Sequence, residues 1–86
     1  MPEISRFFGI VVQMYYGDHA PPHFHVRYGR ETALVGIRDL VVIGGTLPPR
    51  ALGLVMEWAV KHREELEANW EKARALQPLL AIDPLE

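Results

Sequence analysis

The chain contains no cysteine, which excludes disulfide bonds, thiolate nucleophiles and cysteine-ligated metal sites. It also has no excess of positive charge, because 9 Lys and Arg residues are balanced by 11 Asp and Glu residues and the formal net charge is -2. General nucleic-acid binders and polybasic membrane binders need a basic surface, so the composition disfavours both. No apolar run approaches the roughly 18 residues that span a bilayer, and the first residues lack the pattern of a signal peptide. We therefore expect a cytoplasmic protein without a membrane partner.

What the sequence does contain is the pattern of one small folded domain of 86 residues, 49% of them apolar. Apolar residues recur with a period of two before Gly44 and with a period of three to four after it. This order predicts an α+β fold in which residues 1–86 form a single domain. Its expected parts are a sheet over residues 1–46, a helical part over residues 47–77 and an extended tail over residues 78–86.

The first part predicts a small antiparallel sheet of three to four strands. The expected strands are residues 7–16, 23–28, 32–37 and 40–43. Gly29 and Arg30 separate two of these runs by the two residues of a tight hairpin turn, with glycine at the first turn position.

The second part predicts one C-terminal helix that packs on one face of the sheet. Its apolar stripe runs from Leu47 to Leu76. A straight helix of this length would measure about 40 Å, which exceeds such a sheet. We therefore expect a long or bent helix, with the bend near residues 61–63.

Residues 18–25 contain three histidines and one aspartate. His23 and His25 are two residues apart on a predicted strand, so they share one face with a backbone separation of about 6.5 to 7 Å. The preceding loop adds Asp18 and His19. These four residues are the candidate ligands of a divalent metal such as zinc, which binds nitrogen and oxygen donors. Within the segment, either proline of residues 21–22 can follow a cis peptide bond.

Two other interpretations of the histidine segment remain open. In the first, His23 and His25 act as acid and base without a metal, and Arg27 on the same face stabilises the charge that develops on a phosphodiester. His62 completes the set of catalytic candidates. In the second interpretation, Asp18 caps a turn and the histidines form a polar interface.

The predicted helix carries a fourth histidine on its apolar stripe. His62 lies four residues after Trp58, and Asn69 follows two turns later on the same face. His62 is then either a buried imidazole that hydrogen-bonds to an acceptor such as Asn69, or it borders a cleft that His23 or His25 also reaches.

Two runs of the sequence together resemble a known family. They are PPHFH at residues 21–25 and the pattern HRxELxxNW at residues 62–70. In this combination the chain resembles the bacterial family called domain of unknown function 4160, which has no established activity. Genes of the family often lie beside that of another small protein, in an arrangement similar to toxin-antitoxin pairs. The resemblance implies a small protein partner that is encoded nearby.

We expect from these observations a small cytoplasmic protein-interaction module that resembles one component of a toxin-antitoxin pair. The expected binding surface consists of His19, His23, His25, Tyr28, His62, Asn69 and Trp70. An exposed edge strand would also permit a homodimer. The alternative is a histidine-based or metal-dependent hydrolase that acts on RNA, so the sequence leaves open whether the chain is an enzyme and whether it binds nucleic acid.

Overall fold

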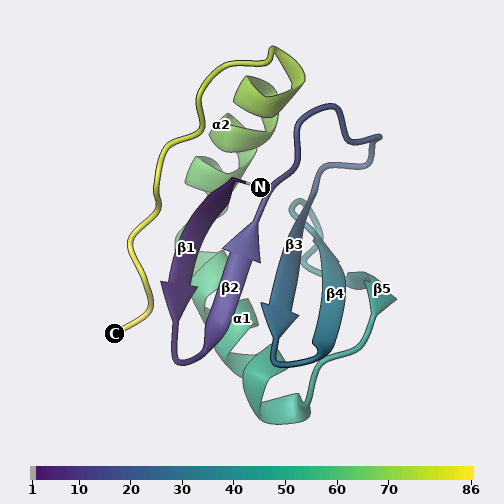
Figure 1. The fold of residues 1–86 in the computed structure, drawn as a ribbon, viewed down its shortest axis with the longest axis vertical. Coiled ribbons are helices and arrows are strands. Elements are labelled where there is room, and N and C mark those ends of the chain that lie inside the picture. The colour runs from purple at the N-terminus through teal and green to yellow at the C-terminus, as the bar shows by residue number, and fades with distance from the viewer. Residues whose placement is uncertain (1) are drawn as a thin grey trace.

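The computed structural model describes residues 2–86 as an α+β domain, in which two helices cover one face of an antiparallel sheet (Figure 1). The sheet has five strands in the order β1-β2-β3-β4-β5. The elements are β1 (Glu3–Phe7), β2 (Ile10–Gln13), β3 (His23–Tyr28), β4 (Glu31–Gly36), β5 (Val42–Gly45), α1 (Pro49–Lys61) and α2 (Arg63–Arg74). The predicted fold class is confirmed, whereas the predicted number of three to four strands and the single helix are wrong.

The additional strand β1 lies almost wholly before residues 7–16, which the sequence predicts as one strand, and a turn near the start of that run separates β1 from β2. Phe8 and Gly9 have φ angles of 50° and 80°, so both central residues of the β1-β2 hairpin are left-handed. This is the geometry of a type I′ turn, which matches the twist of the flanking strands. Phenylalanine rarely adopts a positive φ, and the turn therefore lacks the usual sequence signal.

The turn at Gly29 and Arg30 connects β3 to β4 as the sequence predicts, and Gly29 has a φ of 60°. The last strand begins two residues later than expected, because Leu40 has a φ of 53° and still belongs to the preceding connection. Gly45 ends β5 with a φ of 74°, and a Cβ there would collide with the carbonyl oxygen of Thr32. A side chain at this position is therefore incompatible with the observed path.

The helical part is divided at His62, whose φ of -121° ends α1 and precedes α2. The break lies within the segment where the sequence predicts a bend. Trp58 of α1 is fully buried and packs against Phe7 and Phe24 of the sheet, with ring centroids 5.5 Å and 5.9 Å apart. The helices thus bury their apolar stripe against one face of the sheet, and the other face is free of helices (Figure 1). No helix within residues 2–86 has the length and apolar character that crossing a bilayer requires.

The tail after α2 runs back beside β1 (Figure 1). The backbone N–H of Ile82 donates to the carbonyl of Ile4 at 2.7 Å, and Trp58 Nε1 donates to the carbonyl of Asp83 at 2.8 Å. Ile82 and Leu85 are buried against the core. The tail therefore covers the β1 edge of the sheet, whereas β5 is the last strand at the opposite edge.

Candidate metal centre

The strand β3 divides its side chains between the core and the open face of the sheet. Phe24 and Val26 are buried in the core, and His23, His25 and Arg27 alternate with them on the other side. The predicted alternation of this strand is therefore present. Since the helices cover the core face, His25 and Arg27 lie where the sheet has no helix layer, whereas His23 at the start of the strand lies against Trp70 of α2.

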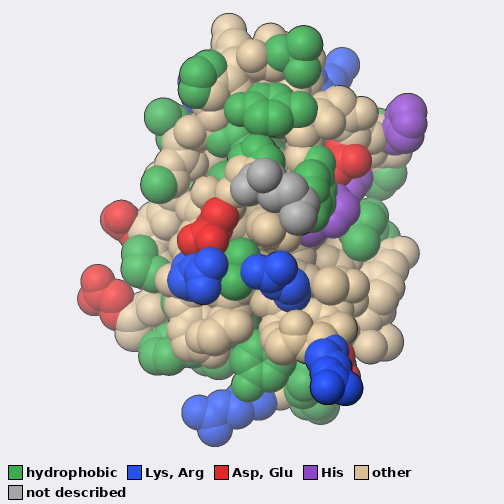
Figure 2. Space-filling model, viewed as in Figure 1, with side chains coloured by type: hydrophobic (Ala, Val, Ile, Leu, Met, Phe, Trp, Pro, Cys, Tyr) green, Lys and Arg blue, Asp and Glu red, His purple; other side chains and the backbone are tan. Residues whose placement is uncertain are grey.

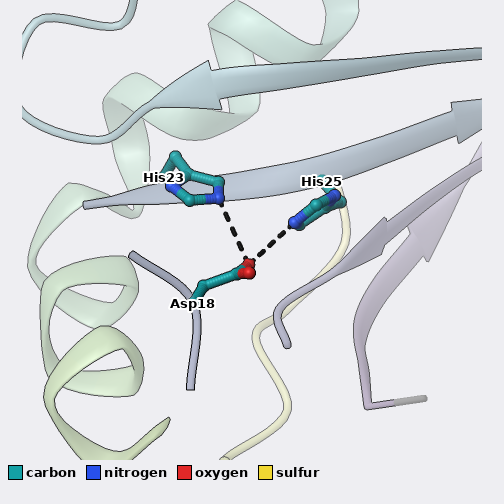
Figure 3. Close-up of side chains that lie close together, drawn as sticks. All are labelled: Asp18, His23 and His25. Atoms are coloured by element: carbon teal, nitrogen blue, oxygen red, sulfur yellow. Dashed lines mark hydrogen bonds and ion pairs between the residues drawn. The ribbon is translucent and has the colours of Figure 1, made fainter. Parts of the chain in front are cut away.

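The loop between β2 and β3 carries Asp18 to both histidines (Figure 3). Its Oδ2 atom lies 2.9 Å from Nε2 of His25 and 3.2 Å from Nε2 of His23. One ligand atom from each of the three residues lies within 4.8 Å of the others. A carboxylate and two imidazoles thus converge on one point, although they come from a loop and a strand.

His23 is held in a fixed orientation at this point. It is 6% exposed, and its ring centroid lies 5.2 Å from that of Trp70, because α2 extends past the end of the sheet where β3 begins. Its Nδ1 lies 2.8 Å from the carbonyl oxygen of Pro21. A carbonyl only accepts hydrogen bonds, so this contact assigns the proton to Nδ1 and leaves Nε2 directed at Asp18. Imidazoles that bind metals are commonly oriented in this way. The Ala20-Pro21 peptide bond that precedes this carbonyl is cis.

His25 is more accessible and has a different neighbour. Its side chain is 23% exposed and meets the ring of Tyr15 edge to face, with centroids 4.2 Å apart. Sequence reasoning did not select Tyr15. The period of two would have placed it on the open face beyond Gln13, to whose Oε1 its hydroxyl lies at 3.5 Å. Tyr15 therefore limits the positions that the His25 ring can take.

The donor set determines which ions fit. Two imidazole nitrogens and one carboxylate oxygen suit zinc, which keeps a free position for water in catalytic sites with three protein ligands. The same set suits iron(II), nickel and other ions that accept imidazole. Magnesium and calcium prefer oxygen donors throughout and fit less well.

Two of the four histidines lie outside this cluster. His19 follows Asp18 directly but is exposed, and the structure does not place it among the converging ligand atoms. His62 lies at the break between the helices, where its Nδ1 is 2.5 Å from Oε1 of Glu65 and its ring is 5.5 Å from Trp58. The structure thus pairs His62 with a carboxylate of its own helix region and not with the sheet histidines.

Asn69 has a role that the sequence did not indicate. It is 1% exposed, and its Nδ2 donates to the carbonyl of Leu80 at 2.8 Å while the Leu80 N–H donates to its Oδ1 at 3.0 Å. The amide therefore pairs with the tail as a strand would, and it is not the acceptor for His62.

Arg27 lies exposed on the open face, two residues after His25. Arg6 occupies the same row of the sheet, because both arginines pair with Val11 in the neighbouring strand. Arg6 forms an ion pair with Glu3 at 2.8 Å, and the hydrogen bond from its guanidinium lowers the pKa of that carboxyl. Within the described residues, Arg27 forms no ion pair, although its charge also helps to lower the pKa of Glu3.

The molecule has hollows, but they lie away from the three converging ligands. One of about 510 Å³ lies against residues 60–65 at the junction of the helices, and one of about 110 Å³ lies between α2 and the tail. Neither is lined by Asp18, His23 or His25. The centre therefore lies outside these two hollows, with Asp18 and His25 partly exposed and His23 buried.

Comparison with known protein families gives a match over most of the chain. The sequence model of a family described as Domain of unknown function (DUF4160) matches residues 9–71. This range contains the three converging ligands, β2 to β5 and most of both helices. No curated protein and no solved structure matches the chain significantly.

Proposed function

Because this chain belongs to the DUF4160 family, whose description assigns no activity, we propose its function from its own geometry: a metal-dependent hydrolase whose ion is held by Asp18, His23 and His25. The observation that supports the proposal is the convergence of the three ligand atoms within 4.8 Å. The buried position of His23 and its bond to the Pro21 carbonyl support it further, since a ligand must be oriented before the ion arrives.

Each residue of the centre has a defined task in this proposal. His23 and His25 supply neutral imidazole nitrogens, and Asp18 supplies one negatively charged oxygen. An ion of the zinc type held there would supply Lewis-acid chemistry and would make a water molecule a better nucleophile. Arg27 lies on the same face at a position where it can hold an anionic substrate. The metal-free alternative gives Asp18 a different task, because its carboxylate then accepts a hydrogen bond from Nε2 of His25, whereas His23, whose Nδ1 holds a proton, donates to Asp18 only as an imidazolium.

Zinc titration separates these two alternatives. We expect the purified chain to bind one equivalent of Zn²⁺ in isothermal titration calorimetry, and we expect its melting temperature to rise because only the folded state presents all three ligands. Asp18→Asn removes the charge of one ligand, and it should weaken the affinity by about 10- to 100-fold. Asp83→Asn is the matched control, since its side chain is exposed in the tail and should leave the affinity unchanged.

The hydrolase itself is tested with a phosphodiester substrate and a chelator. Cleavage of a single-stranded RNA or of bis(p-nitrophenyl) phosphate should stop in EDTA and return when Zn²⁺ is added in excess. Cleavage that persists in EDTA would instead support a histidine-based reaction. Absence of zinc binding, or equal binding by the wild type and Asp18→Asn, would refute the metal centre.

A second candidate function, a module that binds a small protein partner as in a toxin-antitoxin pair, is favoured by the β5 edge of the sheet. Ile43 on this strand and Val41 directly before it are 45% and 51% exposed, and β5 has no neighbour on its outer side within the described residues. The tail covers the other edge. Open edges of this kind accept a strand from a partner.

Co-purification with the product of the adjacent gene tests this second function. Ile43→Lys places a charge on the open edge and should weaken the complex by more than about 10-fold, because charged residues on edge strands oppose pairing. Val60→Lys is the matched control, since Val60 is 63% exposed and belongs to α1 and not to β5. Size-exclusion chromatography with light scattering would detect a homodimer, and a monomer that elutes apart from the partner would contradict this function.

A further inference from the structure

The open face of the sheet carries a row of residues next to the proposed centre. The pairing of strands β1 to β4 places four residues side by side: Arg6, Val11, Arg27 and Thr32. The two arginines are exposed, and Val11 between them is only 5% exposed. Since neighbouring strands are about 4.8 Å apart, the two arginine backbones lie about 10 Å apart on this face.

The adjacent row contains His25, so the proposed ion and Arg27 are close together. Two residues along a strand correspond to about 6.5 to 7 Å. An arginine side chain can bridge much of this separation, and its planar guanidinium binds phosphate oxygens in pairs. A phosphate group that places one oxygen on the ion can therefore have another oxygen within reach of Arg27.

The charge of this face depends on the ion. Arg6 and Arg27 balance Glu3 and Asp18, so the four side chains together are neutral. A divalent ion adds two positive charges at the centre. Figure 2 shows this side of the molecule, with Lys and Arg side chains grouped near acidic side chains and below the histidines. An anion should thus bind here when the ion is present and bind poorly when it is absent, which agrees with an overall net charge of -2.

The shape of the site indicates the kind of anion. Pockets for small ligands usually enclose most of the ligand surface, and the hollows of this molecule that are described above do not contact the centre. An extended polymer gains contacts along an open surface without being enclosed. A flexible single strand can follow the twisted sheet more closely than a rigid duplex can.

We infer that the face formed by the Asp18, His23 and His25 centre and by Arg27 and Arg6 binds the phosphodiester backbone of a single-stranded nucleic acid. The inference rests on the proposed metal centre. An ion held by Asp18, His23 and His25 would offer a position for one phosphate oxygen, and Arg27 would hold a second oxygen or the neighbouring phosphate. Arg6 contributes at the far end of the row, where it is partly neutralised by Glu3.

Fluorescence anisotropy with a labelled 12-nucleotide single strand, measured on ice, tests the inference. The zinc-loaded chain should bind the strand at least 10-fold more tightly than the chain in EDTA. Arg27→Ala should weaken binding of the strand by about 5- to 10-fold while the Zn²⁺ affinity of the same variant stays unchanged. Arg30→Ala is the matched control, because Arg30 lies in the β3-β4 turn outside the row. Two phosphate contacts predict a slope of log affinity against log salt of about -1.4.

The outcomes of this experiment separate the inference from the metal proposal. If zinc binds but the strand does not, or if Arg27→Ala binds the strand like the wild type, the inference fails and the metal centre stands. If zinc does not bind, both fail. Competition by an acidic peptide of equal charge at equal concentration would show an unspecific anion surface and would also overturn the inference. RNA and DNA of one sequence should bind with similar affinity if the backbone is recognised.

Discussion

Trp58→Ala is expected to remove a large part of the free energy of unfolding. Trp58 is fully buried between Phe7 and Phe24, and the removal of such a side chain costs about 3 to 5 kcal/mol. A domain of 86 residues has a total stability of about 4 to 13 kcal/mol, so the loss is a large part of it. Urea unfolding followed by circular dichroism measures the change.

Trp58→Phe separates the two contributions of this side chain. Phenylalanine keeps much of the aromatic contact but cannot donate to the carbonyl of Asp83, which Trp58 Nε1 reaches at 2.8 Å. The expected loss is about 1 to 2 kcal/mol, in the range of a hydrogen bond plus a small packing defect. Proteolysis should then cut the tail of this variant first, since the bond to Asp83 helps to hold it. If Trp58→Phe and Trp58→Ala lowered the free energy of unfolding equally, packing of the Trp58 ring could not be its main contribution to stability.

His23→Ala and His25→Ala are expected to affect the metal equally but the fold unequally. Each removes one of three ligands, which should weaken Zn²⁺ binding by roughly 100-fold or more. His23→Ala should also lower the stability of the metal-free chain by about 1 to 3 kcal/mol, because His23 is 6% exposed, bonds to Pro21 and packs on Trp70. His25→Ala should change that stability by less, since its side chain is 23% exposed. Calorimetry and denaturation in EDTA give the two quantities independently.

His19→Ala provides the control for this pair. His19 is exposed and lies outside the converging ligands, so its removal should leave both the Zn²⁺ affinity and the stability unchanged. A loss of affinity as large as that of His25→Ala would mean that the bound ion uses a ligand set different from Asp18, His23 and His25.

The parts of the fold that the sequence predicted are those determined by neighbours along the chain. Alternation over residues 23–28 placed three side chains on each face of β3, and glycine at position 29 indicated the hairpin turn. The helical period over the C-terminal part located the helical region and the bend near His62. In each case the signal lies within one element or one turn, where backbone geometry and side-chain period act directly.

The parts that the sequence missed depend on uncommon local geometry or on contacts between distant segments. The turn at Phe8 and Gly9 requires a positive φ at phenylalanine, which the β1-β2 hairpin imposes because both strands bury their apolar faces. The helical spacing offers Asn69 as one possible acceptor for His62, but Asn69 bonds to Leu80, which only the path of the tail brings near it.

The candidate centre shows the same division. The sequence by itself determined that His23 and His25 share one face, because residues two apart on a strand must do so. It offered Asp18 and His19 equally as further ligands, since a loop has no fixed period. The tertiary structure selected Asp18, placed the Pro21 carbonyl on His23 and brought Trp70 and Tyr15 against the rings. Spacing decides which side chains lie on one surface, whereas the folding of the loop and of α2 onto that surface decides which groups converge.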